Sequence, residues 1–193
     1  MNSYDSSNVN LDIFTVGEMV DKAIVHLSSI GNIGKINLQK GVFLYLISLA
    51  KARGYDAEKV LKIAGFEPYK FGPFSDFLNG EIDQLKGYKE ISIRGNGDSI
   101  KVTTNKSSIN RYKLDHQEKL IMENVKHLVQ DLEPMEMMFY IYFNPAIDSR
   151  LREYFTKDSE IKEKLLKDRD KYIKKLMDKN ILDEDAANMI LYA

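Results

Sequence analysis

Two short segments, about thirty residues apart, constrain the fold of this chain most strongly. Residues 38–45, Leu-Gln-Lys-Gly-Val-Phe-Leu-Tyr, are typical of a helix, and residues 66–74 are aromatic and contain two prolines. Because a residue before proline avoids the helical region, we expect the first part of the second segment to be extended. Pro73 follows Gly72, and proline suits the first helical position, where its missing amide costs nothing. The pair therefore predicts that a third main helix starts there and ends near Gly87.

The helices before the third one are predicted from capping and spacing. Thr15 and Glu18 form a candidate capping box that opens a first helix, residues 15–30, with an apolar stripe at helical spacing. A second helix is expected over residues 36–53, where a glycine ends it. A short third element, residues 56–64, starts at an aspartate that can cap it and ends before a glycine.

A β-hairpin is predicted over residues 89–104. Isoleucine and valine alternate with polar residues on both sides of residues 95–98, Gly-Asn-Gly-Asp. Asn-Gly is a strong signal for a tight hairpin because both positions tolerate positive φ. Helices followed by a hairpin in this order predict a mostly α fold with a small β-hairpin, that is, a winged-helix-like core with residues 89–104 as its wing.

A polar loop is predicted at residues 105–110, and further helices follow it. Helices are expected over residues 114–132, 135–143 and 156–179 and after Asp183, and the third of these is charged and amphipathic. The predicted organisation is a polar N-terminal segment (1–14), a helical domain with the wing (15–150) and charged amphipathic C-terminal helices (151–193). The apolar stripe within residues 159–177 needs a cover, which a second copy in a homodimer or the chain's own core could supply.

Composition excludes several classes of function. The 193 residues carry a formal net charge of −1, whereas a protein that coats nucleic acid nonspecifically needs a large cationic excess. The absence of cysteine excludes disulfides, thiolate zinc sites and a cysteine nucleophile. Residues 1–10 do not resemble a secretory signal, and the longest apolar stretch, residues 42–50, is too short to span a bilayer. We expect a cytoplasmic protein without a membrane partner.

No catalytic or metal-binding constellation stands out in the sequence. His116, Glu123 and His127 fall on nearly one helical face, which raises a metal hypothesis. However, seven residues of helix span about 10 Å, too far for His116 and Glu123 to hold one ion. Glu123 and His127 are better explained as a surface pair at i, i+4 spacing. We therefore expect no enzymatic activity, no cofactor and no bound metal.

Charge distinguishes the third helix from the wing. In winged-helix proteins the third helix normally enters the major groove, but residues 74–86 carry Asp76, Glu81 and Asp83 against Lys86 alone. The wing and its exit have a local balance of +4, from six cations against two acids. The six are Lys89, Arg94, Lys101, Lys106, Arg111 and Lys113. They could contact DNA phosphates or an acidic protein surface, or belong to a solvated hairpin.

An aromatic run connects the short helix to the third main helix. Its members are Phe66, Tyr69, Phe71, Phe74 and Phe77. They could stack on bases, line a protein-binding groove or pack in the core. Core packing explains most of them, and Tyr69 and Phe74 are expected to be partly exposed because they flank the turn.

Leu38-Gln39-Lys40 followed by the Gly72-Pro73 turn resembles the SocA-like or Panacea group of small proteins, particularly its YwgA-like branch. The aromatic stretch before Pro145 is similar to a downstream helix of that group. Gly41 departs from the pattern, because the family more often has a large apolar or basic residue there. The resemblance implies a non-enzymatic adaptor: an antitoxin that neutralises a partner protein, such as a toxin, by direct contact, or an adaptor associated with mobile elements and defence genes. The expected partner-binding residues are Tyr69, Lys70, Phe71, Gly72, Pro73 and Phe74 at the turn, with Arg94 and Lys101 on the wing.

Overall fold

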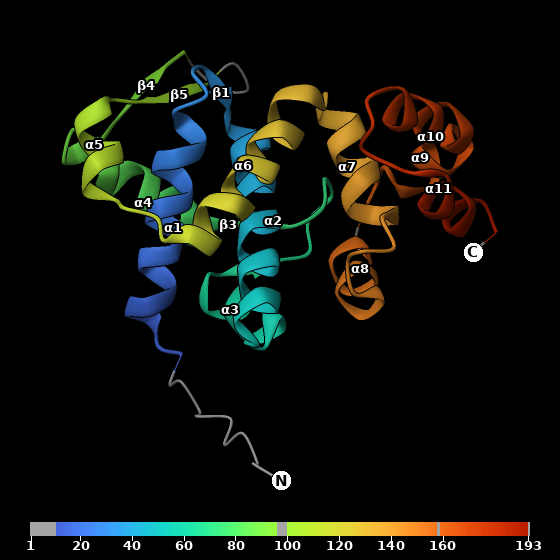
Figure 1. Ribbon diagram of the computed structural model, residues 1–193, viewed down its shortest axis with the longest axis horizontal. Helices are drawn as coiled ribbons and strands as arrows, with labels where there is room; N and C mark the ends of the chain where they lie inside the picture. Colours follow the sequence, from blue (N-terminus) through green and yellow to red (C-terminus); the bar gives the residue numbers. More distant parts are fainter. Residues whose placement is uncertain (1–10, 96–99, 158, 193) are drawn as a thin grey trace, which may run out of the picture.

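The computed structural model describes residues 11–95, 100–157 and 159–192, which form eleven helices and five short strands. The mostly helical fold with a small antiparallel sheet was predicted correctly. Helix α1 (Ile13–Ser28), strand β1 (Ile33–Gly34), helix α2 (Lys35–Arg53), helix α4 (Asp76–Gly87) and strands β4 (Ile91–Arg94) and β5 (Lys101–Thr104) follow one another as in a winged helix. These elements occupy one side of the molecule, and the C-terminal helices occupy the other (Figure 1).

The three-stranded sheet has the order β1-β5-β4, and both pairings are antiparallel. Val102 lies between Ile33 of β1 and Ile93 of β4, so these apolar residues are in register across the sheet. The β4–β5 pairing confirms the predicted hairpin strands. Most of the predicted Gly-Asn-Gly-Asp turn, residues 96–99, lies outside the described residues.

An inserted segment separates α2 from α4. It consists of helix α3 (Ala57–Ile63), strand β2 (Phe66–Glu67) and strand β3 (Phe74–Ser75), and the two strands pair with each other. The predicted helix start at Pro73 was wrong, because Phe74 instead pairs with Glu67 in this ladder. Ser75 is the N-cap of α4, and its hydroxyl accepts a hydrogen bond from the amide of Leu78 at 3.0 Å.

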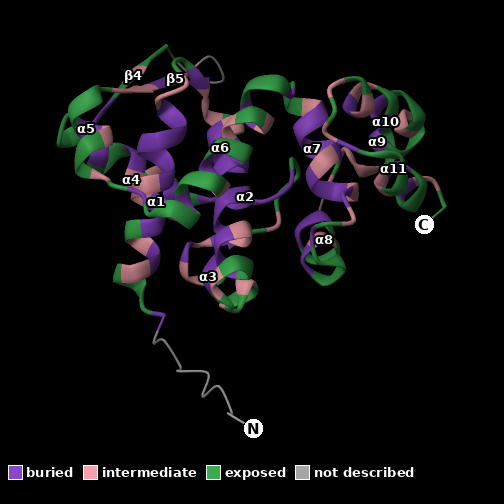
Figure 2. Cartoon of the chain, in the orientation of Figure 1, coloured by how far each residue is buried: buried purple, intermediate pink, exposed green. Residues whose placement is uncertain are grey.

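Helix α2 lies at the centre of the fold, as predicted over residues 36–53. All residues from Leu38 to Leu46 are buried, and Figure 2 shows the helix surrounded by the others. Because Gly41 has no side chain, α1 and helix α6 (His116–Asp131) can pack closely against α2 at this position. A Cβ atom there would lie 2.8 Å from Leu27 of α1 and 2.9 Å from Val129 of α6. A large residue, which the family more often has at this position, would not fit here.

Two local predictions in the N-terminal half need correction. Asp12, not Thr15, is the N-cap of α1, because its carboxylate accepts the amide hydrogen of Thr15 at 2.8 Å. Residues 105–110 do not form a simple loop but helix α5 (Lys106–Arg111). Asn105 caps this helix, because its side-chain oxygen accepts a hydrogen bond from the amide of Ser108 at 2.8 Å. The polar composition of the segment favours a loop instead.

The C-terminal part consists of helices α7 (Pro134–Phe143), α8 (Ser149–Thr156), α9 (Lys162–Lys167), α10 (Arg169–Asp178) and α11 (Glu184–Leu191). The single helix predicted over residues 156–179 is therefore broken, with Asp168 ending α9 and opening α10. Of its apolar stripe, Leu165, Tyr172, Ile173 and Leu176 are buried within the chain, and Tyr172 stacks on Phe139 of α7 with ring centroids 5.2 Å apart. The stripe thus does not need a second copy to cover it.

Two buried glutamates join the helices through ion pairs. Glu118 on α6 lies 3.3 Å from Lys22 of α1 and 3.1 Å from Arg53 of α2. Glu136 on α7 lies 2.8 Å from Lys175 of α10, and its second oxygen also binds a lysine. Burial alone would raise the pKa of Glu136, but its hydrogen bonds to lysines lower it to about 2. No described helix is both long and apolar enough to cross a membrane.

Candidate functional site

The turn between β2 and β3 is fixed by the side chain of Gln39, which projects from α2. Its amide donates to the carbonyl of Ser75 at 2.9 Å, and its carbonyl oxygen accepts the Ser75 amide at 3.1 Å. Both groups are buried, so each bond replaces a lost interaction with water. The Ser75 hydroxyl also donates to the carbonyl of Ala64 at 2.7 Å. One glutamine side chain therefore satisfies the backbone of the strand that leads into α4.

Lys40, the next residue of α2, holds the other side of the turn. Its ammonium group donates to the carbonyl of Pro73 at 2.6 Å, and the residue is 3% exposed. Burial lowers the pKa of Lys40 to about 7. No described carboxylate lies within ion-pair distance of it. The Gln-Lys pair and the Gly-Pro turn, which the sequence singled out separately, are thus one hydrogen-bonded unit.

Gly72 closes the turn in a conformation that favours glycine. Its φ is +78°, and its amide donates to the carbonyl of Tyr69 at 2.9 Å. An added Cβ would lie 2.9 Å from the ring of Tyr142 on α7. The Tyr142 hydroxyl donates to Ser159 at 2.8 Å, and the amide of Glu160 donates to the Lys70 carbonyl at 3.2 Å. The turn is therefore held from α2 on one side and from the α8–α9 connection on the other.

The turn presents aromatic side chains to solvent. Tyr69 is 47% exposed and Phe71 39%, whereas Phe74 is half-buried with its ring centroid 5.1 Å from that of Tyr69. Of the expected partner-binding residues, Gly72 and Pro73 are buried, so they shape the turn rather than present a side chain. Tyr69, Lys70, Phe71 and Phe74 remain as the aromatic turn surface, the name used below for these four residues.

The wing cations are distributed unevenly. Arg94 and Lys101 are exposed and lie directly opposite each other in the β4–β5 ladder. Like charges in this arrangement repel each other, and an anion could relieve the repulsion. Arg111 instead forms an ion pair with the buried Glu90. Lys89, Lys106 and Lys113 are also exposed, but only Arg94 and Lys101 form a cross-strand pair.

The helix that would enter a DNA groove carries acidic residues. Asp76 and Asp83 of α4 are exposed and Glu81 is half-buried. Burial raises the pKa of Asp21 on α1 to about 7, and the neighbouring Glu81 contributes to the shift. This concentration of carboxyl groups opposes the approach of phosphates to α4.

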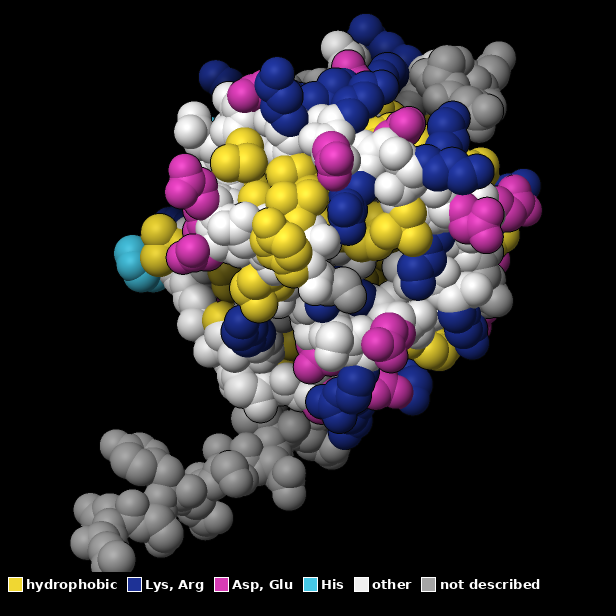
Figure 3. Space-filling view, turned by 90° about the vertical axis from the view of Figure 1, so that its right-hand side faces the viewer, with side chains coloured by type: hydrophobic (Ala, Val, Ile, Leu, Met, Phe, Trp, Pro, Cys, Tyr) yellow, Lys and Arg dark blue, Asp and Glu magenta, His cyan; other side chains and the backbone are white. Residues whose placement is uncertain are grey.

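The side that carries the C-terminal helices has no single sign of charge. Figure 3 shows hydrophobic side chains gathered there among interspersed basic and acidic ones. The exposed apolar side chains of this part include Leu166 of α9 and Met189 of α11.

The described residues contain no group of three or more side chains suited to holding a metal ion. Glu123 forms an ion pair with Lys126 at 3.0 Å, and not with His127 as the i, i+4 spacing predicted. Sequence reasoning missed Tyr142 and Ser159, which support the turn from 70 or more residues further along the chain. No pattern in the sequence connects them with Gly72. Ser75, by contrast, could have been found, because serine before an aspartate-led helix is a common N-cap.

Comparison with protein-family models, curated proteins and solved structures found no match for this chain.

Proposed function

We propose that this protein is a non-enzymatic, cytoplasmic interaction module that binds and regulates or neutralises a partner protein, in the manner of an antitoxin. The observation that carries the proposal is the aromatic turn surface and its buried support. Gln39 and Lys40 are buried polar residues that hydrogen-bond to the backbone of Ser75 and Pro73, and Gln39 also donates to Asn79 of α4. Exposed aromatic residues on a rigid support are typical of protein-binding hot spots, because little conformational entropy is lost on binding.

A variant of the aromatic turn surface tests the proposal. Tyr69→Ser combined with Phe71→Ser removes both exposed rings and leaves the Gln39 and Lys40 hydrogen bonds in place. We expect the tagged wild-type protein to capture one stoichiometric protein from its host lysate after nuclease treatment, and the double variant to lose at least about tenfold in affinity. Mass spectrometry identifies the partner, and titration of the purified partner measures the change.

Tyr88→Ser is the matched control, because Tyr88 is 68% exposed but lies at the C-terminal end of α4. It should leave capture unchanged. Equal capture by wild type and double variant would remove the turn from the binding site, and the absence of any stoichiometric protein would contradict the proposed function itself.

A winged-helix DNA-binding regulator is the second candidate, and the Arg94–Lys101 pair favours it. Such a protein would contact the phosphate backbone through the wing, and its affinity for duplex DNA would fall steeply with added salt. The acidic α4 argues against base readout by that helix. We therefore place this function second.

Charge reversal of the wing separates the two candidates. Arg94→Glu with Lys101→Glu keeps a like-charge pair across the ladder, so the hairpin should retain its stability. We expect weaker binding of the captured protein, by about tenfold, if the wing contributes to the interface. Lys164→Glu with Lys174→Glu, on α9 and α10, is the control with the same change in net charge. Unchanged partner affinity would exclude the wing, and salt-sensitive DNA binding lost only in the wing variant would favour the second candidate.

A further inference from the structure

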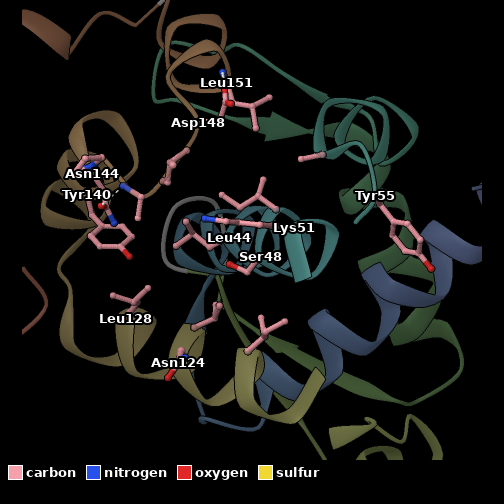
Figure 4. Close-up of a pocket in the computed structure, with 17 residues that line it drawn as sticks. Leu44, Ser48, Lys51, Tyr55, Asn124, Leu128, Tyr140, Asn144, Asp148 and Leu151 are labelled. Carbon is pink, nitrogen blue, oxygen red and sulfur yellow. Dashed lines mark hydrogen bonds between the residues drawn. The ribbon is translucent and has the colours of Figure 1, made fainter. Parts of the chain in front are cut away.

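A cavity of about 660 Å³ lies between α2, α6 and the chain that connects α7 to α8. Figure 4 shows side chains from these elements arranged around it, with Leu44, Ser48 and Lys51 of α2 on one wall. Its buried apolar lining includes Leu44, Val125 and Ile147. The volume falls within the range of about 300–1,000 Å³ that is usual for small-molecule sites. The cavity is separate from the aromatic turn surface, none of whose residues line it.

Ser48, Lys51 and Asn124 line the cavity, and no hydrogen bond or ion pair joins their side chains to the described residues; Lys51 and Asn124 are exposed, and Ser48 is half-buried. Ser48 and Lys51 are three residues apart on α2 and so share a helical face. Asn124 lies on α6 and also lines the cavity (Figure 4). Lys51 is the only cation in the described lining. The three side chains together offer N–H and O–H donors at the rim of an apolar space.

Two other polar residues of the lining, Asp148 and Asn144, interact within the chain. Asp148 caps α8, and one of its oxygens accepts the amides of Arg150 at 2.9 Å and Leu151 at 3.4 Å. The Arg150 guanidinium lies 3.6 Å from the same oxygen. Asn144 accepts the amide of Ala146 at 2.9 Å. The acidic residue of the cavity is thus compensated, whereas the charge of Lys51 is not.

We propose that this cavity binds an anionic amphiphile, a molecule with an apolar body and one carboxylate. The aliphatic lining would cover the body, and Lys51 with Ser48 and Asn124 would receive the carboxylate through charge-assisted hydrogen bonds. This site is independent of the proposed protein-binding function and uses a different surface.

Octanoate is the probe, and octan-1-ol is its neutral counterpart of the same chain length. Titration monitored by amide NMR shifts should show octanoate binding with a dissociation constant of about 1 mM or lower, with the largest shifts at the cavity residues. Octan-1-ol should bind about tenfold more weakly. Lys51→Met, which keeps an apolar side chain of similar length, should weaken octanoate about tenfold and leave octan-1-ol unchanged.

Two further variants test whether the ligands bind in the cavity. Lys119→Met removes an exposed lysine of α6 outside the cavity and should leave both dissociation constants unchanged. Ala146→Phe should fill part of the cavity and weaken both ligands. Absence of octanoate binding at millimolar concentration, equal binding of octan-1-ol, or an unchanged Lys51→Met variant would overturn the proposal. So would shifts remote from the cavity. Loss of protein capture in Lys51→Met without any octanoate binding would instead assign the cavity to a protein partner.

Discussion

Between about pH 7 and pH 10 the free energy of unfolding of the wild-type protein should rise with pH, and a Lys40→Met variant should not show this rise. The pKa of Lys40 is lowered from 10.5 to about 7 by burial in the folded protein. Between these values the unfolded chain binds more protons than the folded one, so the free energy of unfolding increases with pH by roughly 1.4 kcal/mol per pH unit. Below about pH 7 both states are charged, and the full cost of burying the ammonium group remains.

Denaturant unfolding at pH 7 and pH 9 measures the effect. Because Lys40 is already about half deprotonated in the folded protein at pH 7, the wild-type protein should gain roughly 2 kcal/mol over the variant between these pH values. Groups such as Asp21 titrate in both proteins and cancel in the difference. Lys119→Met, an exposed substitution, should follow the wild-type profile. Parallel profiles for wild type and Lys40→Met would show that Lys40 does not change its protonation state in this range.

Gly72→Ala should destabilise the protein by about 2–5 kcal/mol. An alanine at φ +78° costs about 1–2 kcal/mol, and its Cβ would lie 2.9 Å from the Tyr142 ring, which adds an overpacking cost of about 1–3 kcal/mol. Gly54→Ala provides a matched control, because Gly54 has φ +69° but no atom within 4 Å of the added Cβ. Both variants carry the backbone penalty, and only Gly72→Ala has the clash.

The difference between the two variants therefore measures the contact between the turn and α7. Equal losses would mean that Tyr142 moves aside without cost. Because the turn must shift to accommodate the methyl group, Gly72→Ala should also weaken capture of the partner protein under conditions where the variant remains folded. Gly54→Ala should not affect capture, since Gly54 ends α2 away from the turn.

Local patterns predicted the main elements where one physical signal dominated. The alternation of Ile91, Ile93 and Val102 identified the wing strands, and Gly54 marked the end of α2 because it adopts the left-handed conformation. Prediction was wrong where two signals competed. Pro73 suits a helix start, but pairing of Phe74 with Glu67 placed it in a turn. The amphipathic spacing continues through Asp168, so it predicted one helix, whereas the structure has two helices, α9 and α10, that meet at Asp168.

The candidate site was predicted in part. The Gln-Lys pair and the Gly-Pro turn were identified as important, but their direct hydrogen bonds could not be read from spacing, because they join residues 33 or more positions apart. Exposure of Tyr69 was expected correctly. The support from Tyr142 and Ser159 and the cavity beside Lys51 depend on how distant helices pack, and no local rule predicts that.

The burial of α2 around its whole circumference limits how this protein can vary. Between Leu38 and Leu46, Lys40 reaches the turn, Gly41 lies against α1 and α6, Phe43 packs on Phe66 and Phe155, and Leu44 lines the cavity. Each residue of an α-helix is rotated by about 100° from the previous one. A single insertion or deletion within this stretch would therefore exchange the neighbours of every following side chain. Length changes during divergence should be confined to the connections outside α2, while the helix itself can vary only by substitution.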